Sequence, residues 1–274
     1  YSTTIEMRDC DNCHFEGNTL SGNTVLQLEY SNSLVIHDNQ VLDHEYGFQL
    51  YQCDSAQVTS NEMIKPTSSM FGARVRNFIY NNNSLSTAIE DNVFSIDDGN
   101  HGYRSGEALI ESHQSVIRNN TYIIDTPNDY AYYNYFLYAN ESVVSGNTFT
   151  AITYGNYRTH FLRTSGSENN RSVVENNIIN IAAHQPSDNG NESWNGVITL
   201  HGYTDCINNT VSNSTTLNYD WNSVGLISSS GAGTIIIGNT LFTSENSLAV
   251  YFENAFNQTF TNNVIHSERE SSAI

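Results

Sequence analysis

An asparagine recurs ten times along this chain inside one short pattern, and this repeat constrains the fold more than any other feature. The pattern is apolar-x-x-Asn-x-apolar, as in FEGNTL, IHDNQV and VTSNEM near the start. Its asparagines are Asn18, Asn39, Asn61, Asn92, Asn120, Asn147, Asn177, Asn209, Asn239 and Asn263. They lie 21 to 32 residues apart, so no interval could hold a separate domain. A period of this length predicts a solenoid of stacked coils.

Within each repeat, apolar and polar residues alternate, for example in SLVIHDNQV. Alternation with period two predicts β-strands. Residues that are β-branched or aromatic fill these stretches, and Gly, Asn, Asp and Ser fill the turns between them. We therefore expect an all-β solenoid of about ten coils. A leucine-rich horseshoe would need a regular leucine pattern and a helical segment, and the sequence has neither.

The repeated asparagine, its apolar flanks and preceding strands such as YGFQLYQ and LAVYFEN resemble the right-handed parallel β-helix of the pectate-lyase-like superfamily. The resemblance covers essentially the full length. It implies three short strands per coil, with like residues stacked from coil to coil. The asparagines would then form a ladder, each amide bonding to the next one about 4.8 Å away. We expect residues 1–274 to form a single β-helix domain of a longer chain.

The charge balance excludes some classes of partner. The formal net charge is −19, and the chain contains only ten Lys and Arg residues. Neutralising phosphates requires basic residues, so nucleic-acid binding is excluded. Binding to an anionic membrane surface is disfavoured for the same reason. Membrane insertion is not expected, because the longest apolar stretches, such as Ile235 to Ile237, are far too short to span a bilayer.

The long repeats carry insertions that are rich in aromatic residues. The extra residues mostly follow the strand after the asparagine, and equivalent turns of a solenoid project on one side, so the insertions should form one wall. Aromatic rings with a polar edge suit sugar faces. The candidates for glycan binding are Tyr103, Tyr132, Tyr133, Tyr157, Trp194 and Trp221. The alternative is that these rings pack the loops against the helix wall.

Two aspartates are the candidate catalytic pair. Asp97 and Asp125 each lie five residues after a repeat asparagine, in adjacent coils. The register therefore places their backbones about one strand spacing apart, with both side chains pointing outward. Carboxylates about 5 Å apart serve retaining glycosidases, and wider pairs serve inverting ones. The alternative is that both aspartates cap turns. We assign no metal and no cofactor.

Near the start of the chain, the spacing Cys10-x-x-Cys13-His14 is that of a c-type haem attachment site. The repeat argues against haem, because Cys13 should face inward and His14 outward, whereas attachment brings both thiols and the histidine to one porphyrin. A local disulfide between Cys10 and Cys13 is the alternative. Cys10 and Cys53 lie two coils apart, about 10 Å, which is too far for a disulfide. Haem binding is kept as a minor alternative.

Two main functions remain. The first is an extracellular glycan-binding β-helix that resembles phage tailspikes and depolymerases, with hydrolysis of a surface polysaccharide as its enzymatic form. The second is a non-enzymatic cell-surface, adhesin or filament protein. The expected partner is a polysaccharide or glycan, with a trimer or filament as the homo-oligomer. The expected location is extracellular, or on a virion or cell surface.

Overall fold

The structure is a computed structural model. It describes residues 3–22, 24–44, 46–65, 77–97, 106–126, 133–154, 160–184, 196–213, 225–243 and 248–267. These ten segments are ten successive coils, numbered here from 1 to 10. No helix that could span a membrane occurs in the described segments.

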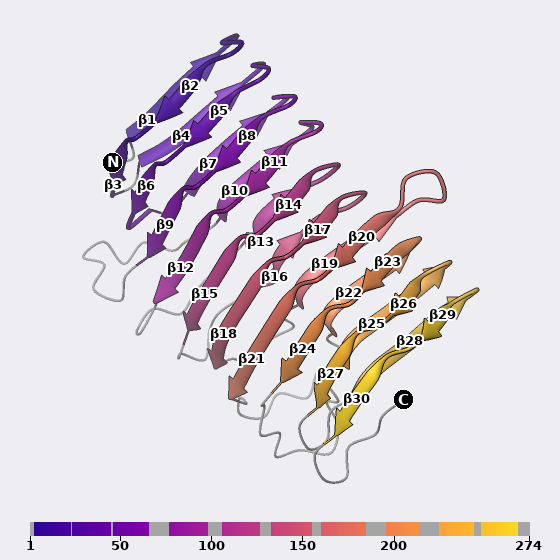
Figure 1. The fold of residues 1–274 in the computed structure, drawn as a ribbon. Coiled ribbons are helices and arrows are strands. Elements are labelled where there is room, and N and C mark those ends of the chain that lie inside the picture. The colour runs from indigo at the N-terminus through magenta and orange to yellow at the C-terminus, as the bar shows by residue number, and fades with distance from the viewer. Residues whose placement is uncertain are drawn as a thin grey trace.

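Each coil contributes one strand to each of three ten-stranded sheets, and all the strand pairs are parallel (Figure 1). The first sheet contains β1 (Thr3–Arg8), β4 (Thr24–Glu29), β7 (Tyr46–Tyr51), β10 (Asn77–Asn82), β13 (Gly106–Ser112), β16 (Tyr133–Tyr138), β19 (His160–Gly166), β22 (Gly196–Gly202), β25 (Gly225–Ala232) and β28 (Leu248–Phe256). The second contains β2 (His14–Glu16), β5 (Val35–His37), β8 (Gln57–Thr59), β11 (Ala88–Glu90), β14 (Val116–Arg118), β17 (Val143–Ser145), β20 (Ser172–Glu175), β23 (Thr204–Ile207), β26 (Ile235–Ile237) and β29 (Thr259–Thr261). The third contains β3 (Thr19–Ser21), β6 (Gln40–Leu42), β9 (Glu62–Lys65), β12 (Val93–Asp97), β15 (Thr121–Thr126), β18 (Thr148–Tyr154), β21 (Ile178–His184), β24 (Thr210–Asn213), β27 (Thr240–Thr243) and β30 (Val264–Ser267).

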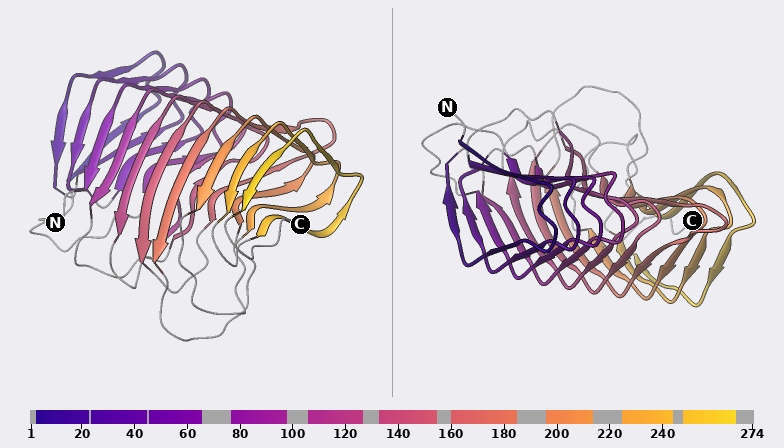
Figure 2. Two further views of the ribbon diagram at one scale, coloured as in Figure 1. Left: turned by 60° about the horizontal axis from the view of Figure 1, so that its bottom comes forward. Right: turned by 90° about the horizontal axis from the view of Figure 1, so that it is seen from above.

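The chain is thus a right-handed parallel β-helix, as the repeat predicts. Coil 1 lies at one end of the stack and coil 10 at the other, and the three sheets form the walls (Figure 2). We call the turn between the first and second sheets the first corner, and the turn between the second and third sheets the asparagine corner. The connection from the third sheet to the next first-sheet strand is the third corner.

The repeat asparagines form a continuous ladder at the asparagine corner. In each of the nine steps, the backbone N–H of one asparagine donates to Oδ1 of the next, at 2.8–3.0 Å. The Nδ2 of the same side chain donates to the same oxygen, at 2.9–3.0 Å. The predicted asparagine ladder is therefore confirmed.

The residue just before each ladder asparagine adopts a left-handed backbone conformation. Its φ lies between 54° and 70° in all ten coils. The ten residues are Gly17, Asp38, Ser60, Asp91, Asn119, Gly146, Asn176, Asn208, Gly238 and Asn262. Only glycine and small polar residues occur there, because this conformation is costly for most side chains and least so for Gly, Asn and Asp. The ladder turn thus needs a two-residue signal rather than asparagine alone.

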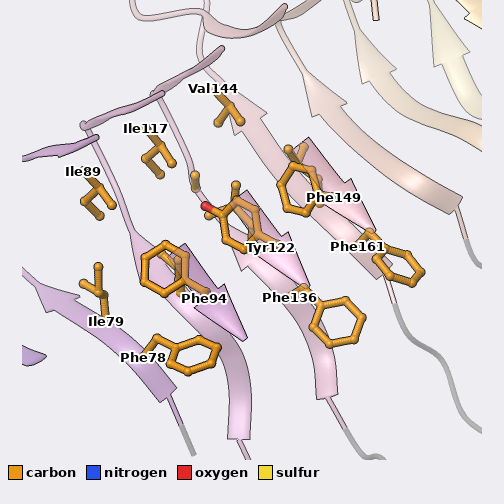
Figure 3. Close-up of a cluster of buried hydrophobic side chains, with 14 of the residues drawn as sticks. Phe78, Ile79, Ile89, Phe94, Ile117, Tyr122, Phe136, Val144, Phe149 and Phe161 are labelled. Atoms are coloured by element: carbon orange, nitrogen blue, oxygen red, sulfur yellow. The ribbon is translucent and has the colours of Figure 1, made fainter. Parts of the chain in front are cut away.

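Inside the helix, like residues stack from coil to coil. Tyr122 lies between Phe94 and Phe149 (Figure 3), with ring centroids 5.1 Å and 4.2 Å away. Phe136 and Phe161 form a second pair with centroids 4.7 Å apart. All five rings are buried. These inward-facing rows are what the alternation in the sequence predicts.

A second buried polar row runs along the first corner. We call the position eight residues before each ladder asparagine the early column, and the position five residues before it the late column. In the early column, the N–H of Cys10 donates to Oγ of Ser31 at 2.9 Å, and the N–H of Cys53 donates to Oγ of Ser84 at 2.7 Å. In the late column, five residues before that asparagine, the N–H of Ser115 donates to Oγ of Ser142 at 3.1 Å.

The two columns meet in coil 5. There the hydroxyls of Ser112, in the early column, and Ser115, in the late column, are 2.7 Å apart. Asn81 of coil 4 adds a bond from its Nδ2 to Ser112 Oγ at 2.8 Å. Coil 4 also has a buried hydroxyl in each column, Ser84 and Thr87, so the buried hydroxyls change column across coils 4 and 5.

Candidate functional site on the outer face of the first sheet

The two candidate catalytic aspartates are direct partners in the third sheet. Asp97 at the end of β12 pairs with Asp125 in β15. Asp125 is half-buried and follows the buried Ile124, so it faces outward. The predicted adjacency of the two backbones is confirmed. Their catalytic role stays a prediction.

The candidate aromatic residues belong, by sequence, to the connections between third-sheet strands and first-sheet strands. Tyr103, Tyr132, Tyr157, Trp194 and Trp221 fall outside the described residues, and Tyr133 is the first residue of β16. The strand order places the connections that carry them after third-sheet strands and before first-sheet strands. Each of these connections therefore leads along the chain into a strand of the first sheet, whose outward-facing side chains form an outer face.

That outer face carries two rows of aromatic and polar side chains. Register partners in one row include Tyr80, Glu111, Tyr138 and Arg163, and in the other Ser165, His201 and Ser230. All of them are half-buried, with part of each side chain open to solvent. We define the outer-face cluster as Tyr80, Glu111, His113, Tyr138, Asn140, Arg163 and His201.

Hydrogen bonds and ring contacts join the centre of the outer-face cluster across adjacent coils. The backbone N–H of Asn140 donates to Nδ1 of His113 at 3.1 Å, so the neutral ring carries its proton on Nε2. Nε2 lies 3.6 Å from Oε1 of Glu111. The His113 and Tyr138 rings meet edge to face, with centroids 4.8 Å apart. Nδ2 of Asn140 donates to the Tyr138 hydroxyl at 3.0 Å, which fixes the orientation of the phenol.

A cation lies beside this centre. Cζ of Arg163 lies 5.3 Å from the centroid of the Tyr138 ring, within the range of a cation–π contact. Burial lowers the pKa of His201, and the charge of Arg163 lowers it further. His201 is therefore neutral at pH 7, with Nδ1 2.5 Å from Oγ of Ser230. The result is one guanidinium flanked by an aromatic ring and a neutral imidazole.

Toward coil 3 the outer face continues with Tyr51, whose ring meets that of Tyr80 at 5.8 Å between centroids. Burial raises the pKa of Tyr51, and the neighbouring Tyr80 raises it further, so its hydroxyl stays protonated and able to donate. Together with the outer-face cluster, the face offers ring surfaces, hydroxyls, an amide, a carboxylate and a guanidinium. These are groups that can bind a polar ligand with apolar ring faces.

Sequence reasoning did not find this cluster. Its members share no residue type from coil to coil, since Tyr80, Glu111, Tyr138 and Arg163 occupy the same row. The sequence gives only their position. The members on the strands, such as Tyr80, Glu111 and Tyr138, alternate with inward-facing residues along the first-sheet strands, which come before the asparagine pattern in each coil.

The Cys10–Cys13 pair forms a local disulfide at the first corner. Cys13 and Phe15 are half-buried against the core, and His14 between them is exposed, as the alternation predicts. Both thiols are joined to each other, and the imidazole faces the opposite side of β2. The arrangement offers haem neither of the two thioether bonds that attachment requires.

The chain is similar to known proteins over part of its sequence and in its fold. The model of the family described as periplasmic copper-binding protein (NosD) matches residues 2–86, which is less than half of the chain. No curated protein sequence matches significantly. Among solved structures, the surface protein and adhesin PfbA of Streptococcus pneumoniae is similar, with 14% identity and a TM-score of 0.61, over 97% of this chain and 77% of that one.

A variant of the tailspike protein of E. coli bacteriophage HK620, in complex with a pentasaccharide, is also similar. It has 13% identity and a TM-score of 0.53, over 93% of this chain and 48% of the tailspike. The chain thus spans about half the length of that tailspike. At such identities both likenesses establish the fold alone.

Proposed function

We propose that this chain is a surface glycan-binding β-helix and that sugars bind on the outer-face cluster and on the third-corner loops. The observation that carries the proposal is the contact of Tyr138 with His113, Asn140 and Arg163 across neighbouring coils. Sugars present apolar ring faces and many hydroxyls, so a fixed aromatic ring surrounded by donors and acceptors suits them. The predicted loop residues Tyr103, Tyr132, Tyr133, Tyr157, Trp194 and Trp221 would extend this surface.

The comparisons support a location outside the cytoplasm. One structural neighbour is a surface adhesin, another is a tailspike bound to a pentasaccharide, and the partial family match is to a periplasmic protein. The Cys10–Cys13 disulfide agrees with such a location, because disulfides persist in oxidising compartments. We propose an extracellular or surface position on a cell or virion.

Binding is tested on an array of bacterial capsular, cell-wall and host glycans, followed by calorimetry with the best ligand. Tyr138→Ala should weaken binding at least tenfold, because it removes the central ring. Tyr30→Ala is the matched control, since Tyr30 is 54% exposed in coil 2 and is not a member of the outer-face cluster. Equal loss in both variants, or none in either, would place the binding surface elsewhere.

Hydrolysis by Asp97 and Asp125 is the enzymatic form of the proposal. Their register pairing gives a backbone spacing of about 4.8 Å, which supports the separation that retaining glycosidases use. The protein is incubated with the bound polysaccharide, and new reducing ends and unsaturated products are measured. Asp125→Asn should abolish release of reducing ends and leave binding intact. Undiminished cleavage in Asp97→Asn and Asp125→Asn would remove this pair from catalysis.

A non-enzymatic adhesin or filament protein is the second candidate. The match to a surface adhesin over 97% of this chain favours it. Its outcome is glycan or host-surface binding without any cleavage product, or assembly into trimers or filaments measured by light scattering and electron microscopy. Cleavage that depends on Asp125 would reject it.

A further inference from the structure

We infer that two copies of this chain pair face to face through the outer side of the third sheet, the wall that runs from β3 to β30 (Figure 1). We define the third-sheet face as the outward residues one and three positions after each ladder asparagine. One row contains Thr19, Gln40, Glu62, Val93, Thr121, Thr148, Ile178, Thr210, Thr240 and Val264, and the other contains Ser21, Leu42, Ile64, Ser95, Ile123, Thr150, Asn180, Ser212, Phe242 and His266. All these side chains are half-buried or exposed.

Charge is nearly absent from the third-sheet face. Glu62 is its one carboxylate, and its two rows contain neither lysine nor arginine. The outward rows of the other two sheets carry more charge, namely Glu6, Arg8, Glu29, Glu111, Arg163 and Glu253 in the first sheet and Glu16, Glu90, Arg118, Glu175 and Asp205 in the second. Low charge thus distinguishes one wall of the described coils from the other two.

Apolar side chains occur where the other walls have charges. Eight large hydrophobic residues are exposed in the described part of the chain, and four of them lie on the third-sheet face. These four are Ile123 at 46%, Ile178 at 46%, Phe242 at 41% and Val264 at 49%. Threonines fill many of the positions between them. Exposed apolar residues gathered on one wall are typical of a protein–protein interface.

The third-sheet face is also regular and stiff. Its strand pairs show no register shift, whereas the first sheet has one between Ser230 and Gly231. The threonine, isoleucine and valine side chains are β-branched, so they have few rotamers to lose on binding. A partner can therefore be bound at a small cost in side-chain entropy.

The partner that fits this face is a second copy of the chain. The formal net charge is −19, so two copies repel each other and approach best where carboxylates are scarce. Both copies present rows with the same spacing of about 4.8 Å, so side chains of one can enter the gaps of the other, as in packed sheets. A sugar is a poorer fit, because neither tyrosine nor tryptophan occurs in these two rows.

The third-sheet face is large enough for a stable pair. Ten strands about 4.8 Å apart make it about 48 Å long, and two outward rows with their side chains make it about 15 Å wide. Full pairing would bury about 700 Å² on each copy and about 1,400 Å² in total, within the range of about 1,200–2,000 Å² for specific interfaces. One self-complementary face produces a two-fold pair, whereas a ring-shaped trimer needs two different surfaces.

The inference does not depend on the proposed glycan site. The outer-face cluster belongs to the first sheet and the first corner, so sugar binding there leaves the third-sheet face open. Asp97 and Asp125 lie two residues beyond the second row, at the border of the third-sheet face. Tyr138→Ala should therefore pair as the wild type does, and Ile123→Lys should bind the same glycan as the wild type.

Sedimentation velocity of the 274-residue chain, measured over a range of micromolar concentrations, tests the pairing. A reversible equilibrium between monomer and dimer is expected. Sodium chloride should strengthen the dimer, because salt screens the repulsion between two acidic copies and the interface holds few charges. A monomer under all these conditions, or a dimer that weakens as salt is added, would overturn the inference.

Lysine substitutions locate the interface. Ile123→Lys and Ile178→Lys should each weaken pairing at least tenfold, because each would bury a charge without a partner. Val116→Lys is the matched control, since Val116 lies in the same coil as Ile123 but on the second sheet, where it is 36% exposed. Each lysine also reduces the net negative charge, which by itself favours association, so a loss must come from the face.

Val116→Lys should pair at least as well as the wild type, and circular dichroism of all variants checks the fold. Unchanged pairing in both Ile123→Lys and Ile178→Lys, or an equal loss in Val116→Lys, would contradict the assignment to the third sheet. Loss of the dimer in Tyr138→Ala would contradict it as well. Loss of glycan binding in Tyr138→Ala, with the dimer retained, is the result that supports both proposals separately.

Discussion

At the residue scale, one ladder asparagine joins three coils. Nδ2 of Asn147 donates to the carbonyl oxygens of Ile117 and Ser145 and to Oδ1 of Asn177, at 2.9–3.1 Å. Its own Oδ1 accepts two bonds from Asn120, both at 3.0 Å. The side chain uses every donor and acceptor of the amide while it is fully buried. No other side chain of similar size supplies this set.

Asn147→Ala should therefore lower the free energy of unfolding by about 3–5 kcal/mol, because it leaves several buried polar groups without partners at about 1–3 kcal/mol each. The shift in the urea midpoint measures the loss. Asn180→Ala is the control, since Asn180 is exposed on the third sheet and should change stability by less than about 0.5 kcal/mol. Equal shifts in both variants would contradict the energetic role of the ladder.

Tyr122 places a polar group in the apolar interior without a hydrogen-bond partner among the described residues. Its hydroxyl is fully buried in the aromatic stack and makes no hydrogen bond to the described residues, and burial raises its pKa well above the ordinary value. Tyr122→Phe keeps the stack and removes this group, so the free energy of unfolding should rise by about 1 kcal/mol. Thermal unfolding measures it. A fall in the melting temperature would show that the hydroxyl is satisfied.

His201 links stability to pH. Its pKa is lowered in the folded state, so between the folded and unfolded pKa values the unfolded chain binds more protons and stability rises with pH. Its contribution is complete above the ordinary pKa of about 6.5 and is lost as the pH falls below it. The stability of the wild type relative to His201→Gln should fall between pH 7 and pH 5. A difference that does not vary with pH would contradict this assignment.

At the element scale, two strands approach closely at Gly47 in β7. A Cβ built there would collide with the backbone carbonyl of Phe78 in the neighbouring β10. Backbone cannot move aside as a side-chain end can, so Gly47→Ala should destabilise the protein by about 1–3 kcal/mol, as overpacking does.

Gly225→Ala in β25 is the matched substitution, because its added Cβ would lie 3.5 Å from the backbone carbonyl oxygen of Ile227, an ordinary contact. It should be neutral or raise stability by less than about 1 kcal/mol, through the unfolded chain. Denaturant midpoints of the two variants measure the contrast. A Gly225→Ala loss as large as that of Gly47→Ala would show that strand propensity, rather than the close approach, dominates.

The residue types that face inward in each strand could be predicted from the sequence, and those that face outward could not. An inward residue such as Ile117 must stack on Ile89 and Val144, so each coil repeats its neighbour's chemistry. An outward residue such as Arg163 faces solvent and need not match Tyr138, its partner in the row. Residues that serve a function on this surface therefore need not recur from one repeat of the sequence to the next.

Two inward features were also missed. The left-handed residue before each asparagine varies among Gly, Asn, Asp and Ser, so its rule concerns φ rather than identity. The hydroxyl row changes column between Ser112 and Ser115, which defeats a search at one fixed distance from the asparagine. The register of Asp97 and Asp125 was predictable because each lies five residues after a ladder asparagine, along one uninterrupted strand.

At the scale of the whole molecule, stability is a sum over neighbouring coils, because each coil contacts mainly the next. Burial is complete in the middle, as at Ile117, but Met7 and Phe15 in coil 1 and Phe260 and Ile265 in coil 10 are only half-buried. The 274-residue chain should therefore open from its two outer coils. Native-state hydrogen exchange with mass spectrometry should find the slowest amides in coils 4 to 7. Uniform protection along the stack would indicate one cooperative unit instead.

The change of column in the buried hydroxyl row has a consequence for recombining the molecule. Coils 2 and 4 supply a polar partner in the early column, as Ser31 and Ser84, coil 6 supplies it in the late column, as Ser142, and coil 5 has a hydroxyl in each column. A spliced chain that joins coil 3 to coil 5 would present Ser112 to the N–H of Cys53. One that joins coil 3 to coil 6 would present Ala139, which is apolar and buried. A splice that removes coil 5 together with coil 4 therefore leaves the N–H of Cys53 without a hydroxyl partner in the early column.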